Sequence, residues 1–288
     1  METKKQDEAL SFIPLRNKLT VHDMQMKKGK EQIVMFCCTE PWLVAAAERA
    51  GVDIIRFPSW GHDSITRLNN TLSMIQQLRA VAPNILLNPF LEPHIVAESD
   101  ESAIRWSTLA MGAGADIVLA LALTPQRVEA LAKQRIPIFC HVGLTPAWYV
   151  EWTGGYVRVG KTAEDALKIY REAYDLQEAG AAMMTVEMTA REVTAEIAKR
   201  LRIPVLSIAG GAGADGAELL HADLLGISPA PIPKHAKQYR QFFNEAVAAL
   251  GEYANDVKTL LYPDREEHSW SMKQEEYERF LEGIEHIR

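Results

Sequence analysis

The chain has 288 residues, which is long for one ordinary domain but typical of a single α/β barrel. Its 31 Lys and Arg against 38 Asp and Glu give a formal net charge of −7, which argues against a nucleic-acid surface. No apolar run approaches the roughly 18 residues of a membrane span, and the first residues lack the apolar core of a secretion signal. The three cysteines show no C-x-x-C spacing, which fits a reducing compartment. We therefore expect a cytoplasmic protein without a nucleic-acid or membrane partner.

Short runs rich in β-branched residues alternate along the chain with longer amphipathic stretches. The predicted strands lie at residues 32–37, 53–57, 84–88, 116–121, 136–142, 182–188, 203–208 and, more weakly, 221–227. The predicted helices lie at residues 41–51, 71–81, 101–111, 125–134, 163–178, 190–200 and 237–251. Continuous apolar strands flanked by helices are typical of a parallel sheet covered on its outer face. Eight such repeats at this length predict a single (β/α)8 TIM barrel.

The pattern also predicts how the chain is divided. We expect an N-terminal extension at residues 1–31, the barrel at residues 32–255 and a C-terminal helical tail at residues 256–288. About twenty residues separate the fifth predicted strand from its helix, which is long for a βα connection, so this segment is a candidate lid. Its aromatic residues Trp148, Trp152 and Tyr156 are expected to cover a ligand, or else to pack on a neighbouring subunit.

In barrels of this type the functional residues lie at the C-terminal ends of the strands and in the loops that follow. This rule selects a short set of chemically active side chains: Cys37, Cys38, Glu40, Arg56, Ser59, Asn88, His141 and Glu187. The glycine-rich loop at residues 210–216 follows the seventh predicted strand. We interpret its glycines as residues that allow tight turns of the backbone, in preference to a phosphate-binding loop.

Several stretches together resemble one enzyme family. They are "HVGLTPAW", "GGYVRVGKTAEDA", "VEM", "IPVLSIAGGAGADGAELLHADLLGI", "PKHAKQY" and "YPDREEHSW", with "LTVHDMQMKKGKEQIVMFC" near the start. In this combination they are similar to ketopantoate hydroxymethyltransferase, which transfers a one-carbon unit from methylenetetrahydrofolate to 3-methyl-2-oxobutanoate. The related phosphoenolpyruvate mutase and isocitrate lyase superfamily shares the barrel. The resemblance implies a homo-oligomer and a small carboxylate substrate.

The sequence departs from this family at the positions that bind its metal. The family holds Mg²⁺ with two aspartates after the second and third strands, assisted by an acidic residue and a lysine on the fourth. In register, these positions hold Pro58, Leu87 or Asn88, Leu119 and Leu121. Such side chains cannot supply the carboxylate oxygens that a hard divalent cation prefers. We therefore expect no Mg²⁺ here, while methylenetetrahydrofolate stays open as a cofactor.

Part of the family's catalytic set is retained. By resemblance, Glu187 is the proton-abstracting base, Ser59 contacts substrate, and His141 belongs to the site. Enolate formation needs a positive counter-charge, and Arg56 lies two residues before Pro58 on the same face of its strand. A buried arginine must meet a carboxylate of substrate or protein. We therefore expect Arg56 to replace the metal, unless its head reaches solvent between barrel and helix.

The lining of the first strand end also differs from the family. Cys37, Cys38, Thr39 and Glu40 stand where the family has threonine, alanine, tyrosine and aspartate. The two adjacent thiols have no base beside them in sequence, so we expect a small polarizable lining, with Cys38, Glu40 and Asn88 contacting substrate. Three functions remain open: aldol-type chemistry on a 2-oxo acid without metal, a recruited lyase, decarboxylase or isomerase, and a non-catalytic relative.

Overall fold

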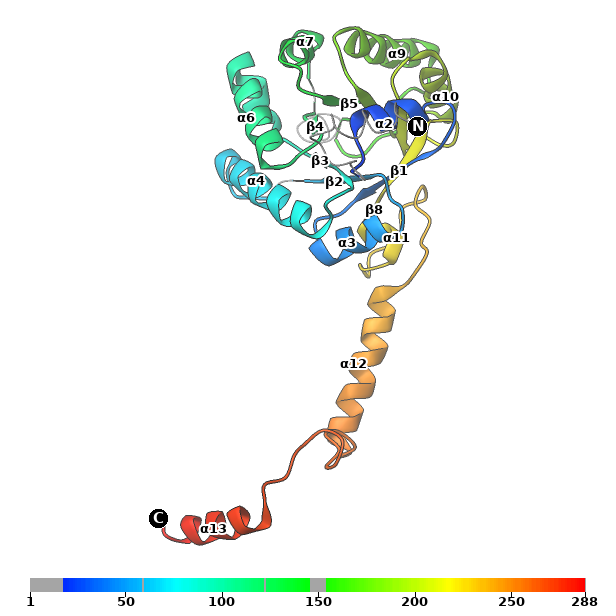
Figure 1. Ribbon diagram of the computed structural model, residues 1–288. Coiled ribbons are helices and arrows are strands. Elements are labelled where there is room, and N and C mark those ends of the chain that lie inside the picture. Colours follow the sequence, from blue (N-terminus) through cyan, green and yellow to red (C-terminus); the bar gives the residue numbers. More distant parts are fainter. Residues whose placement is uncertain (1–17, 59, 122, 146–153, 288) are drawn as a thin grey trace, which may run out of the picture. The chain divides into compact units, whose positions relative to one another are not determined.

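Parallel strands form a ring at the centre of the computed structural model, which describes residues 18–58, 60–121, 123–145 and 154–287 (Figure 1). Among these residues the strands are β1 Ile33–Cys37, β2 Ile54–Phe57, β3 Leu86–Pro89, β4 Val118–Leu119, β5 Ile138–Gly143, β6 Met183–Glu187, β7 Val205–Ile208 and β8 Gly216–Leu220. They pair in the order β3-β2-β1-β8-β7-β6-β5-β4. A bridge between Phe90 and Leu119 joins the two outer members. The predicted (β/α)8 barrel is confirmed.

Helices surround this ring of strands (Figure 1). They are α3 Pro41–Arg49, α4 Ser64–Val81, α5 Pro93–Glu98, α6 Asp100–Ala113, α7 Pro125–Lys133, α9 Ala163–Glu178 and α10 Arg191–Arg200. Several begin at a side chain that accepts a hydrogen bond from the first turn, as Asp63 does from the Thr66 N–H at 2.9 Å. Ser99, Thr124 and Thr162 cap α6, α7 and α9 in the same way. Up to the seventh strand each predicted strand and helix has a counterpart in the structure with shifted ends, and α4 begins seven residues before its predicted start at residue 71. Helix α5 was not predicted.

The eighth strand was predicted in the wrong place. The stretch at residues 221–227 begins with a short helix, α11 His221–Leu225, and the strand is the preceding segment, β8. Hydropathy favoured the apolar residues of "HADLLGI" over "GAELL", which contains a glycine and a glutamate. The glycine is required, because a Cβ on Gly216 would collide with the Ile33 carbonyl of β1. The glutamate, Glu218, is buried inside the barrel at 5% exposure.

An extended glycine-rich segment, in place of a helix, connects β7 to β8. A Cβ on Gly211 or Gly213 would collide with Arg191 or Ala195 of α10, and both glycines have positive φ. The loop therefore lies tightly against α10. This packing agrees with the predicted turn geometry of the glycine-rich loop.

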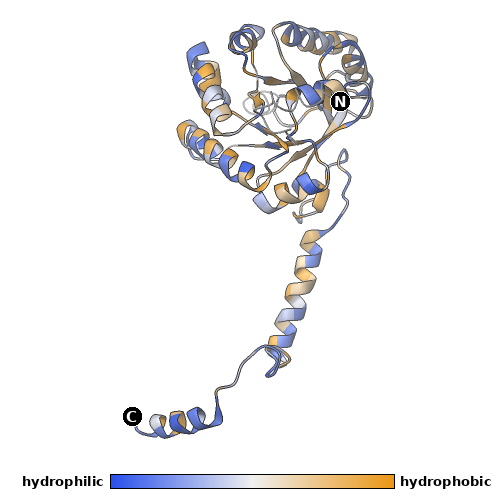
Figure 2. Cartoon of the chain, viewed as in Figure 1, coloured by the Kyte–Doolittle hydropathy of each residue, from blue (hydrophilic) through white to orange (hydrophobic). Residues whose placement is uncertain are grey.

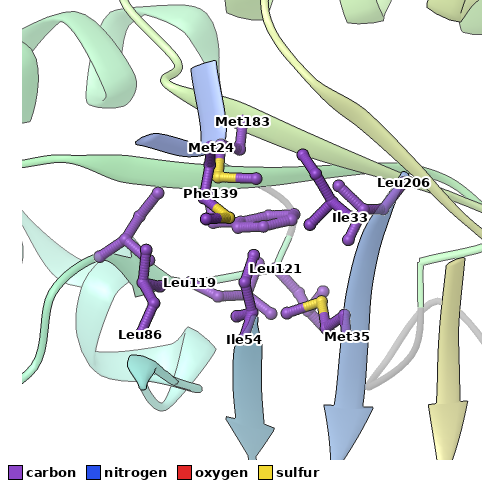
Figure 3. Close-up of a cluster of buried hydrophobic side chains, with 11 residues drawn as sticks. Met24, Ile33, Met35, Ile54, Leu86, Leu119, Leu121, Phe139, Met183 and Leu206 are labelled. Atoms are coloured by element: carbon purple, nitrogen blue, oxygen red, sulfur yellow. The ribbon is translucent and has the colours of Figure 1, made fainter. Parts of the chain in front are cut away.

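A short helix closes the N-terminal end of the barrel. Helix α2 Val21–Lys27 begins with a capping box, in which Thr20 and Asp23 accept each other's backbone N–H. Its Met24 is fully buried beside Phe139 in the core cluster, which also contains Leu86 (Figure 3). The other members of this cluster are Ile33, Met35, Ile54, Ile117, Leu119, Leu121, Met183 and Leu206.

Ion pairs connect α2 and the residues next to it with aspartates that precede the strands. Lys27 Nζ lies 2.5 Å from Asp53 Oδ1 before β2, and Lys28 Nζ lies 2.7 Å from Asp215 Oδ2 before β8. Lys18 Nζ likewise lies 2.5 Å from Asp116 Oδ1 before β4. The same carboxylates accept backbone N–H groups, as Asp215 does from Val205 at 2.9 Å. The aspartates at this end are thus largely shielded from solvent and paired with partly exposed lysines.

The chain separates into two compact units. The first comprises the described residues up to Leu224 together with Ile232–Lys237, and the second comprises Leu225–Pro231 and the residues from Gln238 onward. The second unit contains α12 Phe242–Lys258 and α13 Gln274–Glu285, both with hydrophobic and hydrophilic residues interspersed (Figure 2). The boundaries predicted from the sequence, at residues 31 and 255, stay a prediction. In the described part of the chain, no helix is both long and apolar enough to span a bilayer.

Candidate active site

His141 and Glu187 meet at the C-terminal ends of β5 and β6. His141 Nε2 lies 2.9 Å from Glu187 Oε2, and the two side chains are 4% and 12% exposed. The contact has the distance of an ion pair but not the alignment of a hydrogen bond, because neither ring nitrogen of His141 has a hydrogen-bond partner among the described residues. A buried imidazole with open hydrogen-bonding capacity next to a carboxylate is typical of a site that awaits a ligand.

The backbone around Glu187 is held rigidly. Its carbonyl accepts from the Leu144 N–H at 2.9 Å and from Thr189 Oγ1 at 3.0 Å. Gly143 has φ +90°, and a Cβ there would collide with the same carbonyl and with Thr189 Oγ1. Met188, directly after the glutamate, has φ +50°, a strained value for a side chain of its size. Glu187 therefore projects from a fixed position.

Arg56 lies inside the barrel and is enclosed by polar partners. Its Nη1 donates to Glu218 Oε2 at 2.6 Å, its Nε to Asn88 Oδ1 at 3.0 Å and its Nη2 to Thr185 Oγ1 at 3.2 Å. The guanidinium also lies over the Phe139 ring, with Cζ 4.6 Å from the centroid. Arg56 is 5% exposed, so its head does not reach solvent between barrel and helix.

Glu218 completes this interior cluster and was missed in the sequence. Its Oε2 accepts from Thr185 Oγ1 at 3.2 Å, and its Oε1 accepts from the Cys37 thiol at 3.0 Å. Burial, and then the neighbouring charge of Glu218, raise the pKa of Cys37 well above its ordinary value, so this thiol stays protonated. A signal was available: with the eighth strand at its true position, Glu218 follows the inward-facing Gly216 by two residues and shares its face.

The other predicted substrate-contacting residues differ in how buried they are and in whether their side chains are already hydrogen-bonded. Asn88 is fully buried and committed, since its Nδ2 donates to the Ile117 carbonyl at 3.1 Å while its Oδ1 binds Arg56. Cys38 is 1% exposed, and burial raises its pKa to about 11. Glu40 is exposed at the start of α3, and Tyr156 is 71% exposed. Ser59, Trp148 and Trp152 lie outside the described residues, so the lid stays a prediction.

The Mg²⁺ implied by the resemblance does not fit the side chains at its expected position. Leu119 and Leu121 are buried in the hydrophobic core cluster, and Pro58 offers no side-chain oxygen. The one polar candidate, Asn88, already binds the Arg56 guanidinium, which would repel a cation. Within residues 18–287, leaving out the undescribed gaps, no group of three or more His, Cys, Asp or Glu could hold a metal ion.

Known proteins resemble the chain in both sequence and structure. The family model of ketopantoate hydroxymethyltransferase matches residues 18–265. The 3-methyl-2-oxobutanoate hydroxymethyltransferase of Hyperthermus butylicus is 34% identical over 278 residues, which cover 92% of this chain and 94% of that protein. The protein of the same name from Bacillus subtilis is 32% identical, with 87% and 94% covered.

Two solved structures share the barrel at low sequence identity. The 2,3-dimethylmalate lyase of the PEP mutase/isocitrate lyase superfamily superposes with a TM-score of 0.54 at 14% identity, covering 93% of this chain and 98% of its own. A phosphonopyruvate hydrolase complex with oxalate and Mg²⁺ gives 0.53 at 11% identity, with 93% and 98% covered. These structures show the fold alone, whereas the sequence matches extend over nearly the whole length. The chain therefore belongs to the ketopantoate hydroxymethyltransferase family.

Proposed function

We propose that this protein is an enzyme that forms a carbon–carbon bond at the α-carbon of a small 2-oxo acid, with Glu187 as the base. One observation carries the proposal: a largely buried carboxylate at the barrel mouth lies 2.9 Å from an imidazole whose nitrogens lack other partners in the described chain. Family membership supports the reaction class, since the curated relatives are named 3-methyl-2-oxobutanoate hydroxymethyltransferases.

The chemistry follows from a base beside a ketone. Glu187 takes a proton from the carbon next to the carbonyl group, and the electron pair of that C–H bond forms the double bond of an enolate while the carbonyl π pair moves to oxygen. The enolate carbon would then attack the methylene carbon of a one-carbon donor, and one C–N bond of the donor would break with its electron pair and a proton ending on nitrogen. One water would replace the remaining C–N bond, which gives the hydroxymethyl product and the free amine. Methylenetetrahydrofolate is the donor that family membership suggests, and 3-methyl-2-oxobutanoate is the 2-oxo acid in the relatives' name.

His141 has a defined part in this arrangement. A carboxylate and an imidazole nitrogen attract each other at 2.9 Å only if one of them carries a proton. We propose that Nε2 carries this proton and that a bound substrate aligns it with the carboxylate, since neither ring nitrogen has a hydrogen-bond partner among the described residues. His141 then orients Glu187 and offers its second nitrogen to the substrate.

We propose further that the reaction proceeds without a divalent metal. The support is the set of side chains at the family's metal position, where two leucines, a proline and an amide already bound to a guanidinium stand in place of three acidic residues and a lysine. A hard cation would gain too few oxygen ligands there to offset its loss of hydration. Positive charge at the site must then come from the protein itself.

The test is proton exchange at the α-carbon. Chelator-treated protein is incubated with 3-methyl-2-oxobutanoate in D2O without a one-carbon donor, and loss of the C3 proton signal is followed by NMR. We expect catalysed exchange in the wild type and a decrease on the order of 10² to 10⁴ in Glu187→Gln, which keeps the shape but not the basicity. The control is Glu192→Gln on α10, where the glutamate is 72% exposed.

Each outcome is informative. Exchange by Glu187→Gln at the wild-type rate contradicts the assignment of the base and favours a recruited lyase, decarboxylase or isomerase. Exchange that is lost on chelation and restored by Mg²⁺ contradicts metal independence while leaving the base in place. Tight binding of several 2-oxo acids without exchange of any of them favours a non-catalytic metabolite-binding protein.

A further inference from the structure

Arg56 and Glu218 form an ion pair inside the barrel. Their side chains are 7% and 2% exposed, and Arg56 Nη1 lies 2.6 Å from Glu218 Oε2. Both charges have lost their water, so their mutual attraction and their other hydrogen bonds must offset a large desolvation cost. Asn88, Thr185 and Cys37 supply those further bonds.

Stability alone does not account for such a pair. Apolar residues of similar volume in place of a buried ion pair are often neutral or stabilising, whereas removal of one partner leaves an uncompensated charge and is strongly destabilising. The neighbouring core cluster consists of apolar side chains alone, so such side chains can fill the interior of this barrel. A charged pair at this one place therefore suggests a functional requirement.

Thr185 places the pair next to the proposed base. Its hydroxyl donates to Glu218 Oε2 and accepts from Arg56 Nη2, both at 3.2 Å. Thr185 is the cross-strand partner of His141 in the β5–β6 register and precedes Glu187 by two residues on the same face of β6. The ion pair and the acid–base pair are thus neighbouring layers of one interior.

We propose that Arg56 is the fixed cation that stabilises the enolate oxygen and that Glu218 is the residue that positions it. This inference rests on the proposed function, because an enolate oxygen forms only if Glu187 removes the α-proton. Among the described residues, Asn88, Thr185 and Glu218 bind three of the five N–H groups of the guanidinium, so two remain for a ligand. Hydrogen bonds from a rigid fork to a developing oxyanion need no reorganisation at the moment of reaction.

The test compares single and paired substitutions. Arg56→Met and Glu218→Leu are made separately and together, and both melting temperature and α-proton exchange are measured. Each single variant should lose stability because one buried charge remains. The double variant should regain a melting temperature near that of the wild type, yet exchange should stay slower on the order of 10² because the cation is gone. The control makes the same two changes in the exposed pair Arg200 and Glu196 of α10.

The result that overturns the inference is a double variant that recovers exchange along with stability, since the pair would then be structural only. If the double variant does not fold, Arg56→Lys decides: it keeps the charge and loses the fork, and we expect exchange to fall on the order of tenfold. Wild-type exchange in Arg56→Lys also overturns it. Glu187→Gln, measured in parallel, tests the proposed function separately, because its inactivity together with an active double variant would refute only the role of Arg56 and Glu218.

Discussion

The two ends of the barrel differ in whether their polar side chains have hydrogen-bond or ion-pair partners. At the N-terminal end, Lys27, Lys28 and Lys18 each lie within 2.7 Å of an aspartate at the start of a strand. At the C-terminal end, His141 has two ring nitrogens without hydrogen bonds in the described chain, and Met188 and Ala209 adopt positive φ. Satisfied polar groups at one end stabilise the fold, whereas the unsatisfied and strained groups at the other end are those that we propose for ligand binding.

This contrast predicts what each end will tolerate. A change at the N-terminal end should lower the free energy of unfolding and leave the chemistry of the folded molecules intact. A change at the C-terminal end should alter the rate more than the stability. Three substitutions test whether the division is this sharp.

The largest effect is expected at Gly143, which lies at the C-terminal end, where we propose the active site, and is packed closely against the Glu187 backbone. Gly143→Ala forces a Cβ against the Glu187 carbonyl at a φ of +90°, so the backbone that carries the base must shift. A base misplaced by about 1 Å lowers the rate on the order of 10². The measurement is α-proton exchange per folded molecule. Gly112→Ala in α6, where nothing lies within 4 Å of an added Cβ, is the control and should leave the rate unchanged.

An unchanged exchange rate in Gly143→Ala would show that the backbone beneath Glu187 is adaptable. The described rigidity of the catalytic end would then have no bearing on function.

The next effect concerns Asp215 at the opposite end. Asp215→Asn removes the charge that binds Lys28 Nζ at 2.7 Å and accepts from the Gly29 and Val205 N–H groups. We expect the free energy of unfolding to fall by about 2–4 kcal/mol, with the exchange rate per folded molecule unchanged. Urea titration and exchange on the same samples give both quantities. The control is Asp175→Asn, on the exposed face of α9. If Asp215→Asn lowered the exchange rate without lowering the free energy of unfolding, the proposed separation between a stabilising end and a functional end of the barrel would be wrong.

The smallest effect is a pH dependence at Cys38, a residue after β1 that behaves like a core group. Burial raises its pKa to about 11, so the folded state keeps its proton where the unfolded chain has lost it. Its contribution to stability is therefore fully present below about pH 9 and is lost as the pH rises toward 11, by about 2 kcal/mol. Urea unfolding from pH 8 to 11 should show a shallower decline in Cys38→Ala than in the wild type. Parallel declines would assign the alkaline loss to other groups.

Hydrophobic periodicity was sufficient for most of the fold. The first seven strands are short runs made mostly of apolar residues, and such runs can be recognised without tertiary information. β8 cannot be recognised in this way, because Gly216 allows the close approach of β1 and Glu218 forms an ion pair with Arg56. Both reasons lie in residues more than 150 positions away, which no local pattern records.

The candidate site was predictable where the family motif and strand ends coincide. Glu187 and His141 follow from that rule, and the structure brings them to 2.9 Å. For Arg56, burial energetics predicted that a carboxylate must meet it, but whether protein or substrate supplies that carboxylate depends on the register of β8. Glu218 is the carboxylate in the structure. The roles of these residues in catalysis stay a proposal for the experiments above.

The mutual dependence of Arg56 and Glu218 limits how this chain can evolve. Loss of either residue alone leaves an unpaired charge in the barrel interior. An evolutionary path that changes one of the two residues before the other therefore passes through a protein of low stability. The two positions should therefore be inherited and exchanged as one unit, although 162 residues separate them in the chain. Homologues that have the arginine should have the glutamate as well, and the metal-binding carboxylates should reappear only where both are gone.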